Sequence, residues 1–108
     1  MTKFNEFTDA VLKDATVLAK DIFNGFEGQA AEVAEAFLEK TKADVQRWCL
    51  LLADQKLTEQ DFSDLVSAKR ALAEIHVLTI SGIALTKIER FRTGLIDSVI
   101  DRAFSILL

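Results

Sequence analysis

Proline is absent from this sequence, and only four of its 108 residues are glycine. Chains that turn often need these two residues at their corners, so a chain with so few of them turns rarely. Half of the residues are apolar and 28% are charged, which is ordinary for a folded domain. We therefore expect a single all-α domain, residues 1–108, in which a few long helices form an antiparallel bundle.

The first segment has the clearest helical period. Its apolar residues recur every three or four positions, which is the spacing of one helix face. They are Phe4, Phe7, Val11, Ala15, Leu18, Ile22 and Phe26. Asn24-Gly25 can end this helix, because glycine accepts the left-handed conformation found at helix C-termini. The pattern predicts a helix over about 3–24.

A second apolar stripe begins after a short connection at 25–28, and Thr41 is its one polar interruption. Its members are Ala30, Ala34, Phe37, Leu38, Val45, Trp48, Cys49 and Leu52. This stripe predicts a helix over about 29–54. Short connections join antiparallel neighbours, so we expect the first two helices to form a hairpin.

The start of the next helix is marked by four residues. Thr58 can cap a helix, and Asp61 stands three residues later, as in a capping box. Leu57 and Phe62 occupy the two positions of a hydrophobic staple. Together they predict a helix that begins at Glu59.

Beyond that point the helical stripe continues through to Ala103 and Ile106, and within residues 79–86 the one residue that disfavours a helix is Gly82. A loop around it would be apolar and would need partners for its backbone groups. We therefore expect one continuous helix over about 59–106, roughly 70 Å long. The alternative is a break at Ser81-Gly82, which would give a monomeric four-helix bundle.

A continuous helix of that length predicts dimerisation. The hairpin helices each span less than roughly 40 Å, so they could cover only about half of it. An uncovered apolar half would make a patch too large for a typical monomer, and a two-fold homodimer is the common way to cover one. The predicted dimer interface, a bundle or coiled-coil contact, consists of Phe91, Leu95, Val99 and Phe104.

The sequence predicts no catalytic or metal site. The single histidine, His76, has no second ligand three or four residues away on its helix face. The single cysteine, Cys49, stands on an apolar face, where we interpret it as a buried structural thiol. We therefore expect no enzyme activity and no cofactor.

Composition also limits the partners and the location. The net charge of −4 offers no basic surplus for nucleic acid. No stretch approaches the roughly 20 consecutive apolar residues that span a bilayer. One cysteine cannot form an internal disulfide, and this favours a reducing compartment. We expect a cytoplasmic protein without a transmembrane segment.

These observations favour a non-enzymatic helical interaction or scaffold protein that acts as a homodimer. The alternative is an amphipathic protein that binds a lipid or granule surface, because eight phenylalanines could anchor such a surface. Helical bundles also need large side chains in the core, and we favour that role for the phenylalanines. A third hypothesis is a helical bundle that binds a cofactor or metal.

Overall fold

The fold is an antiparallel helical bundle, with no β-strand among the residues that the structure describes. The structure is a computed structural model that describes residues 3–73 and 75–108. It is 85% helical, so the predicted all-α fold is confirmed. The four main helices are α1 (Lys3–Phe23), α2 (Glu27–Ala53), α3 (Glu59–Ala68) and α5 (Leu85–Arg102).

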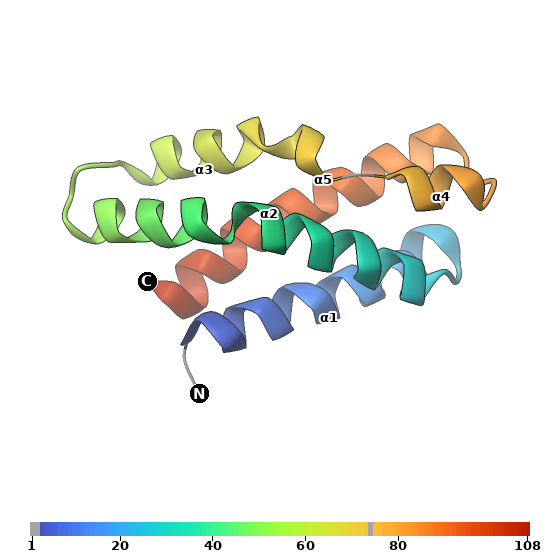
Figure 1. The fold of residues 1–108 in the computed structure, drawn as a ribbon, viewed down its shortest axis with the longest axis horizontal. Coiled ribbons are helices and arrows are strands. Elements are labelled where there is room, and N and C mark those ends of the chain that lie inside the picture. Colours follow the sequence, from blue (N-terminus) through green and yellow to red (C-terminus); the bar gives the residue numbers. More distant parts are fainter. Residues whose placement is uncertain (1–2, 74) are drawn as a thin grey trace.

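The helices alternate in direction along the chain. Figure 1 shows α2 between α1 and α3, with α5 crossing behind α2. α5 packs against α1 on one side and α3 on the other. The short helix α4 (His76–Ile80) connects α3 to α5, and α5 continues into a π-helical turn at Ala103–Leu107.

The first two helices form the predicted hairpin, with one shift in its boundaries. Asn24 and Phe26 take positive φ angles of 56° and 62°, which turn the chain sharply. α2 therefore begins at Glu27, two residues before the predicted start. Phe26, which we had placed on the apolar face of the first helix, lies in this turn and is 38% exposed.

Large apolar side chains from all four main helices fill the core. Four phenylalanines have no exposed surface: Phe7, Phe37, Phe62 and Phe91. Trp48 is 6% exposed, so its predicted place in the core is confirmed. Thr41 is buried as well, and its hydroxyl donates a hydrogen bond of 2.9 Å to the carbonyl of Phe37. That bond satisfies the one polar side chain in the buried stripe of α2.

The start of α3 is the capping box that the sequence predicts. The Thr58 hydroxyl accepts a hydrogen bond of 3.0 Å from the backbone amide of Asp61. In return, the Thr58 amide donates to the Asp61 carboxylate at 3.1 Å. Leu57 packs against the core in which Phe62 is buried. Two amides at this helix end thus have side-chain acceptors.

The continuous helix over 59–106 is wrong, because the chain breaks twice. α3 ends at Ala68 and is followed by a single 3-10 turn, Arg70–Leu72. The second break is the alternative that we considered at Ser81-Gly82, where Gly82 takes a φ of +80° that favours glycine. These breaks let α5 fold back onto α3, and the apolar face that a long helix would expose is buried within the chain.

The four residues of the predicted dimer interface take different places from those expected. Phe91, Leu95 and Val99 have no exposed surface within the single chain. Phe104 is half-buried and packs on Phe62, with 5.4 Å between the ring centroids. The uncovered face from which we predicted a dimer is therefore absent. A homodimer stays a prediction and must use another surface.

The phenylalanine pairs show how α5 is held from both sides. The ring of Phe23 in α1 lies 5.4 Å from that of Phe91 in α5. The ring of Phe62 in α3 lies 5.4 Å from that of Phe104, which follows the C-terminal end of α5.

Within the described ranges, no helix combines the length and apolar character needed to cross a membrane.

Candidate interaction surfaces

The residues that sequence analysis tested for chemistry remain apart from one another. His76 is exposed at the first position of α4. Cys49 is half-buried on α2, and burial raises the pKa of its thiol. A raised pKa lowers the thiolate fraction and with it the reactivity. Among residues 3–73 and 75–108, no three histidine, cysteine or acidic side chains come close enough to hold a metal ion.

One charged cluster joins α1 to α5. The Arg102 guanidinium donates two hydrogen bonds of 2.8 Å, one to each carboxylate oxygen of Asp14. The Ser98 hydroxyl donates a third, at 2.7 Å. These bonds, with that to Arg102 the strongest influence, hold the pKa of Asp14 below its usual value against the opposing effect of burial. The cluster aligns the two helices, and sequence analysis did not predict it because its members are 84 to 88 residues apart.

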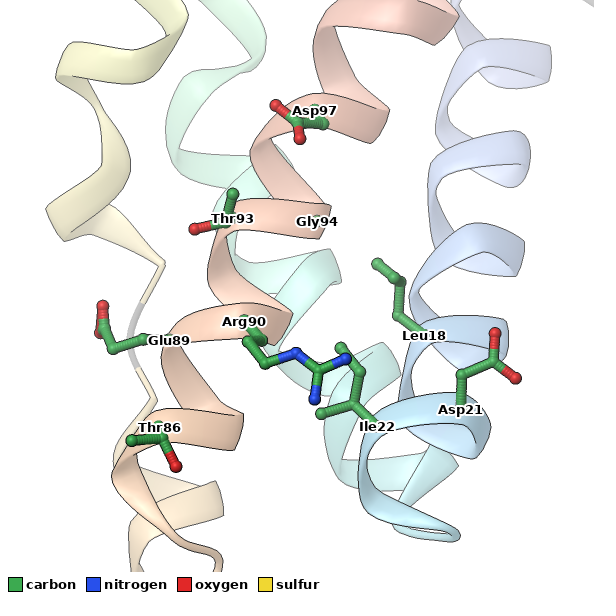
Figure 2. A pocket seen from close by; sticks show the side chains of 9 residues that line it. All are labelled: Leu18, Asp21, Ile22, Thr86, Glu89, Arg90, Thr93, Gly94 and Asp97. Carbon is green, nitrogen blue, oxygen red and sulfur yellow. The ribbon is translucent and has the colours of Figure 1, made fainter.

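A shallow groove runs between α1 and α5, next to this cluster. It has two adjoining hollows of about 550 and 330 Å³, which share Leu18, Gly94 and Asp97. The other residues that line it are Asp14, Val17, Asp21, Ile22, Thr86, Glu89, Arg90, Thr93, Ser98 and Asp101. Figure 2 shows the larger hollow, with Leu18 of α1 directed toward Gly94 and Arg90 reaching from α5 toward α1.

The floor of this groove depends on Gly94. A Cβ atom at that position would lie 2.9 Å from both terminal methyl carbons of Leu18. Glycine therefore lets Leu18 lie directly against the α5 backbone, and the two helices approach closely. The middle of the groove is an apolar floor flanked by polar residues of both helices.

The second surface is the outward face of α2. We call Ala36, Ala43 and Leu50 the outer ridge of α2. All three are exposed, and Leu50 is 69% exposed, which is high for a leucine. Leu50 also borders an apolar groove of about 460 Å³, whose other lining residues are Phe4, Gln46, Cys49, Ala53, Leu107 and Leu108. The sequence pattern predicts the buried face of α2 and a solvated face with Glu32, Glu35 and Glu39, but the exposure of Leu50 was not predicted.

Charges along α2 are separated by sign around this ridge. The exposed acids of its first half are Glu32, Glu35 and Glu39, and the exposed bases that follow are Lys40, Lys42 and Arg47. Asp44 falls among the bases and pairs with Arg47 at 2.9 Å and with Lys69 of α3 at 3.4 Å, so Arg47 already has one acidic neighbour within α2. The helix therefore presents an acidic half and a basic half.

Comparison with known proteins does not assign this sequence to a family. No family model matches this sequence, and no curated protein or solved structure is similar enough to be matched with it.

Proposed function

We propose that the protein is a non-enzymatic helical interaction protein that acts as a two-fold homodimer, with the outer ridge of α2 at the contact. The observation that carries this proposal is the 69% exposure of Leu50 beside an apolar groove. A large apolar side chain on an exposed helix face that continues into an apolar groove is typical of an interaction surface.

The spacing of the ridge suits a second helix. Ala36, Ala43 and Leu50 are seven residues apart, so they lie along one line of the helix surface. The two alanines allow a close approach, and Leu50 supplies apolar area. Two copies of α2 related by a two-fold axis through the ridge would run antiparallel.

Charge favours a second copy as the occupant of this face. In an antiparallel pair, the acidic half of one α2 lies beside the basic half of the other. With Ala43 at the two-fold axis, Ala36 stands opposite the partner's Leu50 and Glu39 stands opposite the partner's Arg47. The axis repeats this charge contact once on each side, which gives two contacts in all, so the pairing is electrostatically complementary.

The alternative functions have less support. The four phenylalanines with no exposed surface serve the core and are not available to a lipid surface. The groove between α1 and α5 has an acidic rim, which anionic lipid would disfavour. The described residues bring together no group of metal ligands on which a metal-binding hypothesis could rest.

The test is the mass in solution by sedimentation or light scattering. The protein should have about twice the 12.0 kDa mass of the chain at tens of micromolar. Ala43→Glu places two like charges at the axis and should give monomers. The control is Ala68→Glu, at an exposed alanine of α3, which should leave the dimer intact.

A charge exchange tests the register. Glu39→Lys or Arg47→Glu alone should weaken the dimer by about 5- to 30-fold, because two exposed pairs worth up to about 1 kcal/mol each are lost. The double variant restores opposite charges and should recover most of the loss. A monomer at every concentration would overturn the homodimer, and a double variant weaker than both singles would overturn this register.

A further inference from the structure

We infer that the groove between α1 and α5 binds a basic amphipathic helix of another protein. This inference goes beyond the proposed homodimer, because the groove uses residues of α1 and α5 and none of the outer ridge of α2. It rests on three properties of the groove: an apolar floor, an acidic rim and a length that fits a short helix.

The floor supplies apolar contact. Val17 is 49% exposed, although it is a large apolar residue and points away from the core. Leu18 and Ile22 are half-buried beside it. Leu18 lies directly against the α5 backbone at Gly94 and forms the bottom of the hollow. An apolar side chain from a docked helix would pack into the hollow that these residues line, as in other complexes of a helix in a groove.

The rim supplies charge. Five acids line the groove against one base, Arg90. Two of these acids already have cationic partners: Asp14 pairs with Arg102, and Glu89 pairs with Arg70 and Arg92. Among the described residues the other three acids form no ion pair, although Asp101 interacts electrostatically with Arg102. These three acids are Asp21, Asp97 and Asp101.

The spacing of these acids fits a helical partner. Asp97 and Asp101 are four residues apart and so lie about 6 Å from each other along one face of α5. Asp21 lies across the groove on α1. The lining residues of α5 extend from Thr86 to Asp101, which corresponds to about 23 Å of helix. A partner helix of about 15 residues with lysine or arginine flanking an apolar stripe would match this groove.

The acidic side chains of the groove also disfavour other kinds of partner. Nucleic acid and anionic lipid would meet the acids of the rim and be repelled. A second copy of this chain would bring a second acidic groove against the first. A cationic segment is the chemistry that the groove complements.

The probe is a 16-residue fluorescent peptide with leucine and alanine on one helix face and lysine on both flanks. Its binding to the full chain is followed by anisotropy. The variant Asp97→Lys/Asp101→Lys should bind at least about tenfold more weakly, since it places two like charges on the rim. The matched control, Asp9→Lys/Asp64→Lys, has the same net charge but changes exposed acids outside the groove. It should bind within about twofold of the unmodified protein.

Two further measurements locate the contact. In an amide NMR spectrum, the peptide should shift the signals of Gly94 and Val17 and leave that of Leu50 unchanged. Binding should persist in the monomeric Ala43→Glu variant, so that failure of the homodimer and failure of this inference are separate results. Equal weakening in the two double lysine variants, or shifts confined to residues outside the groove, would overturn the inference. A melting curve of each variant shows whether its fold is retained.

Discussion

Two charged clusters hold α5 in the bundle, and they do different work. The first joins regular helices: Asp14 of α1 has both carboxylate oxygens paired, to Arg102 and Ser98 of α5. The second joins α5 to the break that follows α3: Glu89 accepts hydrogen bonds from Arg70 at 3.0 Å and from Arg92 at 2.8 Å. Both clusters lie at the surface of the bundle, and in each of them both carboxylate oxygens accept hydrogen bonds, but the second cluster leaves the buried Nε atom of Arg92 without an acceptor among the described residues.

The second cluster also supplies hydrogen-bond donors to two backbone carbonyls, one at the break after α3 and one within α5. Arg92 donates to the carbonyl of Ala73 at 3.4 Å, and Arg70 donates to the carbonyl of Glu89 at the same distance. The first cluster therefore aligns two regular helices, whereas the second also gives a hydrogen-bond donor to a carbonyl where the chain is broken.

The largest expected effect is on the unfolding free energy, and it compares a buried residue between α1 and α5 with an exposed residue of α4. Phe91→Ala should cost about 3–5 kcal/mol of unfolding free energy, because Phe91 is fully buried against Phe23. Ile80→Ala should change it by less than about 0.5 kcal/mol, because Ile80 is 71% exposed. Denaturant unfolding measures both. Similar losses for the two variants would show that the end of α4 is as tightly packed as the core.

The next effect breaks the first cluster. Asp14→Asn should cost about 1–3 kcal/mol, because the Arg102 and Ser98 donors lose a charged acceptor. Lys13→Gln changes a neighbouring charge outside the cluster and is the control. An unfolding free energy unchanged by Asp14→Asn would mean that the cluster does not align the helices.

Acid should produce the same loss in the unmodified protein. The pKa of Asp14 is lowered in the fold, so its contribution is present above its ordinary pKa of about 4. That contribution is lost as the pH falls below this value through the lowered pKa. The difference in stability between the protein and Asp14→Asn should therefore shrink below about pH 4. A difference that stays constant down to pH 2 would contradict the assignment.

A smaller effect tests the start of α3. Thr58→Ala should cost about 0.5–2 kcal/mol, because the Asp61 amide loses its side-chain acceptor. Thr58→Ser keeps the hydroxyl and should restore most of the stability. Equal melting of the alanine and serine variants would show that the cap contributes nothing measurable.

The smallest effect tests the second cluster. Glu89→Gln should cost no more than about 1 kcal/mol, because Glu89 and Arg70 are both more than a third exposed and solvent weakens their pair. Hydrogen exchange in residues 69–73 should nevertheless increase, since the shared acceptor loses its charge and one of its two oxygens is replaced by an NH2 group that cannot accept from Arg70 or Arg92. A loss as large as that of Asp14→Asn would remove the distinction between the two clusters.

The sequence by itself determined the local structure. The stripes of Phe7 and Phe37 predicted two helices and their buried faces, and the pairing of Thr58 with Asp61 predicted the first residue of α3. These features depend on residues three or four positions apart, which contact one another in any helix. They are therefore visible before the fold is known.

Only the tertiary structure decided the course of the chain after Ala68 and the surfaces that result. Leu72, Ala73 and Ile75 pack against the core although the helix is interrupted there. Because these positions are apolar in either case, the apolar period in the sequence does not reveal the break. A long helix would have left Phe91 and Leu95 uncovered, whereas the folded-back chain buries them against its own helices. Contacts such as Asp14 with Arg102 connect residues 88 positions apart. The free energy that favours them depends on the whole packed bundle, and no local pattern in the sequence contains it.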